Sequence, residues 1–185
     1  TGWFFANNVL VHNCSFCIEP FRDTGKPSWR VKSPKRVAEE ALQAHRLFPK
    51  LDGVYLDGPT ENVRDDRCME IADEMFIRRI PFSMMTRVDT LELKTWGYMI
   101  DRGLFYVKAG MESANQALVD SCGKKLDLAR VRETVAYLKK RLPPRSVHLT
   151  TMYGLPGETY ETVKETLTFL KEMGVHWQES YCAPT

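Results

Sequence analysis

Short apolar runs alternate with amphipathic stretches along most of this 185-residue chain. Between the runs, apolar residues recur at helical spacing, as Val37, Ala41, Ala44 and Phe48 do. Alternation of this kind, with no internal linker, implies parallel strands joined by helical crossovers. The predicted fold class is therefore α/β, with strands at residues 54–56, 82–85, 105–109, 147–152 and 175–181.

The helices between these strands have recognisable starts and buried faces. The first should begin at Ser33-Pro34, because serine caps a helix and proline suits its first turn. Further helices are expected at 91–104 and 115–121. The expected inner faces of the others are formed by Cys68, Ile71, Ala72, Met75 and Phe76, by Leu128, Val131, Val135 and Leu138, and by Val163, Leu167 and Leu170.

Unusual polar and glycine-rich segments stand where strands end. In an α/β barrel, functional residues gather at the carboxyl ends of the strands. We therefore expect these segments to share one edge of the sheet. They are Cys14 with Cys17, Asp57-Gly58-Pro59-Thr60, Arg87, Gly110 to Ser113, and Gly154 to Glu158.

Composition limits the kinds of partner. The formal net charge is only +2, with no basic stripe of the kind that binds nucleic acid. No apolar run is long enough to span a bilayer, and the first residues make a poor signal peptide. The five cysteines are odd in number and mostly scattered, which predicts a reducing, cytoplasmic location.

Cys14 and Cys17 form the only close cysteine pair. A zinc site would need a second cysteine or histidine pair at suitable spacing, and none follows. A thioredoxin-type redox pair would need the first cysteine at a helix start in a small domain. Cys68, Cys122 and Cys182 are expected to be packing residues, although Cys182 follows the last strand and could face the cavity.

From Cys14 onward the chain resembles the radical S-adenosylmethionine (radical SAM) superfamily. The family signature is Cys-x-x-x-Cys-x-aromatic-Cys, and Cys14-Ser15-Phe16-Cys17 matches its second half. The resemblance implies a partial TIM barrel of (β/α)6 type. It also implies a [4Fe–4S] cluster held by Cys14 and Cys17, with Phe16 beside SAM.

The same resemblance assigns SAM contacts at the other strand ends. Asp57, Gly58, Pro59 and Thr60 occupy the loop that binds the SAM amino group. Gly110, Glu112 and Ser113 match the family's Gly-x-Glu-Ser segment. Arg87 could be a surface charge, but its strand-end position makes it a candidate for binding the SAM carboxylate or the substrate. Gly154 and Gly157 belong to the turn near the adenine.

The implied activity is formation of a 5′-deoxyadenosyl radical that abstracts hydrogen from a small-molecule substrate. Residues 29–34 and 86–89 look most like the cobalamin-associated, hopanoid-biosynthesis-like branch. A cobalamin domain, if there is one, would lie upstream. The substrate itself cannot be read from this core.

One position departs from the family. The third cluster cysteine should stand four residues before Cys14, where the chain has Leu10. Leucine cannot ligate iron. Taken alone, this predicts a degenerate, cluster-free barrel that serves as a binding or scaffold module.

The residues around Leu10 suggest another explanation. Thr1 to Asn13 resembles the C-terminal end of an intein, with Phe-x-Ala-Asn, an apolar run, His-Asn and a following Cys. In such a site Asn13 cyclises and breaks the bond to Cys14, His12 acts as general acid, and the Cys14 thiol accepts the upstream chain. Protein splicing is thus a further candidate activity of this chain.

The two resemblances together predict a domain division. Residues 1–13 would be an intein remnant, and residues 14–185 a radical SAM core without its first strand and first cluster cysteine. The missing cysteine would lie in an upstream partner segment, the N-extein. Splicing would then join it to Cys14.

Overall fold

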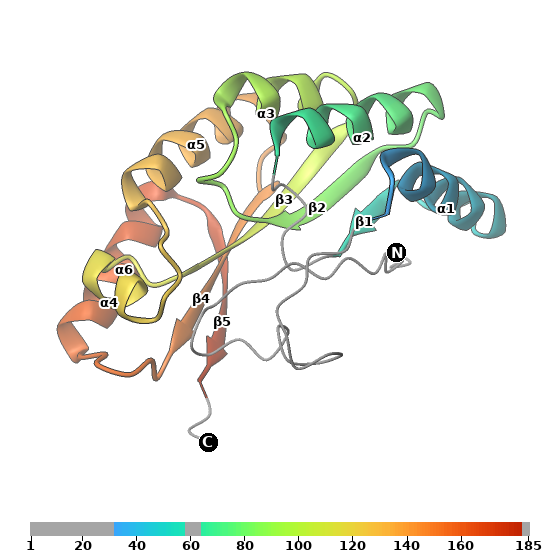
Figure 1. Ribbon diagram of the computed structural model, residues 1–185. Helices are drawn as coiled ribbons and strands as arrows, with labels where there is room; N and C mark the ends of the chain where they lie inside the picture. Colours follow the sequence, from blue (N-terminus) through green and yellow to red (C-terminus); the bar gives the residue numbers. More distant parts are fainter. Residues whose placement is uncertain (1–31, 58–63, 183–185) are drawn as a thin grey trace.

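A computed structural model of the chain describes residues 32–57 and 64–182 (Figure 1). All five strands in these ranges belong to one sheet, and every neighbouring pair is parallel. The predicted α/β fold is confirmed. In sheet order the strands are β1 (Val54–Leu56), β2 (Phe82–Thr86), β3 (Leu104–Glu112), β4 (Val147–Tyr153) and β5 (His176–Tyr181).

The helices lie along one side of the sheet (Figure 1). Because the strand order never reverses, the crossovers stay on that side, as in a barrel and unlike a doubly wound sheet. We call the other side of the sheet its inner face. The helices are α1 (Pro34–Leu47), α2 (Asp65–Ile77), α3 (Leu93–Ile100), α4 (Gln116–Ser121), α5 (Leu128–Arg141) and α6 (Tyr160–Met173).

Local sequence signals set several helix ends. As predicted, the Ser33 side chain caps α1 by accepting a hydrogen bond from the Arg36 backbone N–H at 3.2 Å. Thr159 caps α6, and Gly174 ends it in the left-handed conformation at φ 55°. Glycine adopts that conformation without the steric cost of a Cβ atom.

Other predicted boundaries and faces were wrong. The helix expected at 91–104 is only α3, since the chain turns at Gly103 with φ 105° and enters β3 at Leu104. Phe48 and Phe76 were expected in the core but are 60% and 58% exposed. Phe48 is the C-cap of α1 and Phe76 is the penultimate residue of α2, so both stand at the end of a helix.

The core lies between the sheet and the helix layer. Along β3, buried residues that face the helices alternate with half-buried residues on the inner face. Val107, Ala109 and Met111 are at most 1% exposed. On α6 the buried positions are Thr166, Phe169, Leu170 and Met173, whereas Val163 and Leu167 are only partly buried.

β5 differs from the other strands because all six of its residues are exposed. In the described residues it pairs only with β4, so one of its edges stays open. Its inner-face positions include Gln178, which stands in register with Thr150 of β4. None of the helices in the described ranges is long and apolar enough to cross a membrane.

Candidate functional site

Four of the predicted segments meet at one edge of the sheet, as the parallel topology requires. Asp57 directly follows β1, and Arg87 directly follows β2. Gly110 and Glu112 are the last inner-face residues of β3, and Gly154 directly follows β4. We call this the carboxyl edge of the sheet.

Glu112 is the most constrained residue at the carboxyl edge. Its φ of 68° lies in the left-handed region, which is uncommon for residues other than glycine. The pairing of β3 with β4 shifts between Gly110 and Glu112, so a bulge re-aims the carboxylate. Strain of this kind persists only where surrounding contacts hold it, and it is concentrated at functional sites.

Lys124 holds the Glu112 carboxylate. Its Nζ lies 2.5 Å from Glu112 Oε1, and the two side chains are 9% and 12% exposed. A Cβ atom at Gly110 would lie 2.8 Å from that same oxygen and 3.0 Å from Nζ. Glycine therefore leaves the space that the ion pair occupies.

Arg87 fixes the loop that carries Lys124. Its Nη1 donates to the Lys124 carbonyl and its Nη2 to the Lys125 carbonyl, each at 3.0 Å. Nη2 and Nε also donate to the two carboxylate oxygens of Asp89, at 2.7 and 3.0 Å. Asp89 in turn accepts from the Asp127 backbone N–H. These bonds support a positioning role for Arg87, which acts through Lys124 on Glu112.

Replacing Arg87 with lysine should lower the free energy of unfolding by about 2 kcal/mol. Lysine keeps the charge, but its single ammonium group cannot bind both carboxylate oxygens of Asp89 and two backbone carbonyls at the same time. Urea unfolding would measure the loss. Arg36→Lys is the matched control, since the Arg36 side chain is 61% exposed and the change should cost less than about 0.5 kcal/mol. Equal effects of the two changes would contradict the loop role of Arg87.

Ser113 points the other way from Glu112. Its side chain is 1% exposed and lies against α6, where its hydroxyl is 3.2 Å from Thr166 Oγ1. It also accepts from the Asn115 backbone N–H at 3.1 Å. These contacts fasten the end of β3 to the helix layer, so the predicted Ser113 hydroxyl is not on the inner face beside Glu112.

The Glu158 side chain closes the turn that follows β4. Glu158 Oε2 accepts from the Gly154 backbone N–H at 2.6 Å. Gly154 and Gly157 have φ angles of 81° and 85°, which require glycine-like freedom. Leu155 is buried against α4 in a small cluster with Leu118, Cys122 and Cys182. The two cysteines pack there, as the sequence predicted.

His148 of β4 lies on the inner face, below the carboxyl edge. Its ring stands 6.4 Å from that of Tyr106 on β3, between centroids. Burial, together with the charge of Lys108 and the neighbouring His176, holds the pKa of His148 below its usual value. Burial also raises the pKa of Tyr106. Both pKa shifts favour the neutral form of the side chain.

Replacing Lys108 with methionine should raise the pKa of His148, although burial will keep it below 6.5, the usual value. Because the folded-state pKa is depressed, His148 favours folding above about pH 6.5, and that contribution is lost as pH falls through the folded pKa. NMR titration of the imidazole would measure the change. Lys171→Met on exposed α6 is the control and should leave the titration unchanged.

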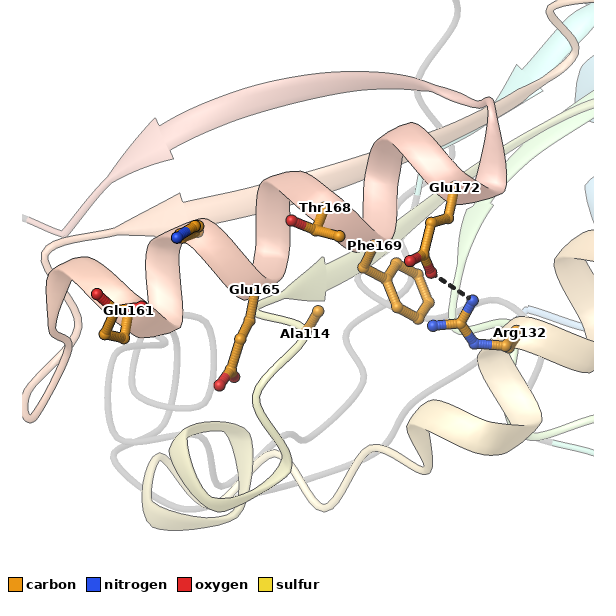
Figure 2. A pocket seen from close by; sticks show the side chains of 8 residues that line it. Ala114, Arg132, Glu161, Glu165, Thr168, Phe169 and Glu172 are labelled. Carbon is orange, nitrogen blue, oxygen red and sulfur yellow. Dashed lines mark hydrogen bonds and ion pairs between the residues drawn. The ribbon is translucent and has the colours of Figure 1, made fainter.

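An open hollow lies on the helix side of the molecule. Figure 2 shows a groove along α6, lined by Ala114, Arg132, Glu161, Lys164, Glu165, Thr168, Phe169 and Glu172. Arg132 Nη1 lies 3.2 Å from Glu172 Oε2, and its guanidinium stacks on Phe169. The groove is open and its charges are of both signs, so it has the character of a solvated helix surface.

The remaining predicted site residues lie outside the described residues. They are His12, Asn13, Cys14, Phe16, Cys17, Gly58, Pro59 and Thr60. Within residues 32–57 and 64–182, no three His, Cys, Asp or Glu side chains are grouped to hold a metal ion. The sequence reasoning missed Lys124, which carries no periodic or motif signal and reaches Glu112 only through the fold.

Two curated relatives match most of this chain. The bacteriochlorophyllide d C-8(2)-methyltransferase of Chlorobaculum tepidum is 26% identical over 171 residues, covering 86% of this chain and 37% of the relative. The threonylcarbamoyladenosine tRNA methylthiotransferase MtaB of Bacillus subtilis is 24% identical over 169 residues. That match covers 86% of this chain and 37% of MtaB. This chain thus spans little more than a third of their length.

Solved structures share the fold. TsrM from Kitasatospora setae, a radical S-adenosylmethionine methyltransferase solved with tryptophan substrate and the SAM analog aza-SAM, has a TM-score of 0.78. It is 15% identical, and the match covers 98% of this chain and 35% of TsrM. The sequence profile of the radical SAM superfamily matches residues 11–170. The strand order, the residues at the carboxyl edge and this match agree that the chain belongs to the radical SAM superfamily.

Proposed function

We propose that this chain is the SAM-binding core of an enzyme that modifies its substrate by radical chemistry. The observation that carries the proposal is the Glu112–Lys124 pair beside Gly110 at the carboxyl edge. It combines a nearly buried carboxylate on strained backbone with a glycine whose missing Cβ leaves room for the ion pair. A scaffold module would have no need of either feature.

Superfamily members use a [4Fe–4S] cluster and SAM, which agrees with the cofactors that the sequence predicts. When bound, these cofactors supply a 5′-deoxyadenosyl radical. The cluster's donors in this chain are the thiolates of Cys14 and Cys17, and a third is still needed. The Glu112 carboxylate, held by Lys124 at the carboxyl edge, fits a ligand that carries hydrogen-bond donors.

The described residues have distinct parts in this proposal. Glu112 accepts hydrogen bonds from SAM, and Lys124 orients the carboxylate through their ion pair. Arg87 holds the Lys124 loop in place. Asp57 and the turn at Gly154 lie at the same edge, so they form the two sides of the SAM site.

We propose transfer of a methyl or methylthio group as the reaction outcome. The curated relatives named above are a methyltransferase and a methylthiotransferase. TsrM has been solved with cobalamin and a [4Fe–4S] cluster bound, and this supports cobalamin use through an upstream domain. A cytoplasmic location and a small-molecule substrate complete the proposal.

SAM cleavage tests the proposed function. Protein that carries a complete cysteine set should be reconstituted anaerobically with iron and sulfide, reduced, and assayed for 5′-deoxyadenosine. Glu112→Ala should abolish SAM binding by equilibrium dialysis, while the iron content stays unchanged. A protein with a complete cysteine set that takes up no cluster, and that neither binds nor cleaves SAM, would instead support the cluster-free scaffold.

We also propose that residues 1–13 are the end of an intein, because His12-Asn13 stands directly before Cys14 and Leu10 stands where a cluster cysteine belongs. The upstream DNA, or a partner gene for splicing in trans, should encode a host segment that ends in Cys-x-x-x. An intein that starts with Cys or Ser should follow it. A reading frame with neither feature would contradict this proposal.

A further inference from the structure

Lys108 reaches across the inner face of the sheet. Its Nζ donates to Gln178 Oε1 on β5 at 2.8 Å. Since β4 lies between β3 and β5, the lysine must cross two strand spacings, about 10 Å. The register places His148 level with Lys108, and Thr150 level with Gln178. The Lys108 side chain therefore crosses β4 between His148 and Thr150.

The charge of Lys108 is not balanced by a carboxylate among the described residues. Among the described residues its side chain donates to the neutral amide oxygen of Gln178. Glu112 stands four residues further along β3, about 13 Å away, and is paired with Lys124. The contact with Gln178 is exposed, so an anionic ligand can reach the ammonium group and pair with its charge.

His148 adds an unused polar atom at the same place. Its Nε2 is buried and has no hydrogen-bond partner. A buried imidazole nitrogen without a partner is uncommon, because losing water without a replacement bond is costly. The neighbouring Tyr106 places a neutral hydroxyl-bearing ring beside it. One cation, one imidazole and one amide thus stand on neighbouring strands of the inner face, with Lys108 in register with His148 and hydrogen-bonded to Gln178.

We propose that Lys108, His148 and Gln178 bind a carboxylate group of the substrate on the inner face of β3–β5. This rests on the proposed function, since it assigns the substrate class for the same barrel. The site lies well below Glu112 along the strands, so it is separate from the carboxyl-edge SAM site. It would hold one end of the substrate while the other end faces that edge.

A carboxylate suits this set better than a phosphate. The site offers one positive charge, and a carboxylate carries one negative charge, whereas a phosphate monoester carries nearly two at neutral pH. Gln178 accepts from Lys108 through its oxygen, which leaves its amide N–H groups to donate. His148 is neutral and can donate from Nε2.

The test uses the full chain without cluster or SAM. Sodium acetate would be titrated while the His148 imidazole and the Gln178 side-chain amide are followed by NMR, with sodium chloride matching the ionic strength. We expect saturable shifts of both groups. Lys108→Met should weaken acetate binding about tenfold or more. Lys171→Met, on the exposed side of α6, should leave it unchanged.

Methyl phosphate and dimethyl phosphate form the comparison arms. If either binds more tightly than acetate, or if Lys108→Met leaves acetate binding intact, the carboxylate site is overturned. Because no SAM is present, this result is independent of the SAM assay. Loss of acetate binding with intact SAM cleavage rejects only the substrate site. Acetate binding without SAM cleavage rejects only the proposed function.

Discussion

Replacing Leu10 with cysteine should raise the cluster content from a small fraction to about one [4Fe–4S] cluster per chain. The change gives Cys-Val-His-Asn-Cys-Ser-Phe-Cys, which completes the family signature with a single substitution. Two thiolates hold a cluster poorly, whereas three fix three of its irons and leave one for SAM. Anaerobic reconstitution followed by iron and sulfide analysis and Mössbauer spectroscopy would measure the gain.

Serine at position 10 is the matched control for this experiment. It is small and polar like cysteine but lacks the sulfur, so loading should stay at the level of the unchanged chain. In the chain with Leu10→Cys, replacing Cys17 with serine should remove the gain. Full loading of the unchanged chain would show that Leu10 does not mark a missing ligand, and would remove one support of the intein proposal.

Replacing Lys124 with alanine should lower the free energy of unfolding by about 3 to 5 kcal/mol, because it leaves the Glu112 carboxylate buried and unpaired. Both side chains are at most 12% exposed, so water cannot replace the lost partner without rearrangement. Chemical denaturation would measure this loss. A loss below about 1 kcal/mol is typical of an exposed pair and would contradict the burial argument.

A double variant separates the structural role of this pair from its cofactor role. Glu112→Gln with Lys124→Met removes both charges and should recover much of the stability lost in Lys124→Ala. It should not recover SAM binding, because glutamine lacks the charge of the carboxylate. If the double variant binds SAM as the unchanged chain does, Glu112 serves only the fold.

Much of this protein follows from local sequence. The strand–helix alternation determined the parallel α/β fold, since helical crossovers require parallel neighbours. Ser33 capped its helix as predicted. Gly154 and Gly157 indicated a turn, and both adopt positive φ angles that suit glycine. The parallel topology then brought Asp57 and Arg87 to one edge.

Tertiary structure alone decided which of these side chains act together. The bulge at the end of β3 turned Glu112 inward, while Ser113 went to the helix layer. Lys124 reached Glu112 because Arg87, 37 residues earlier, holds its loop. Lys108 met Gln178 across 70 residues of sequence. Such pairings depend on register and on side-chain direction, and both are set by packing between elements that the local sequence does not relate.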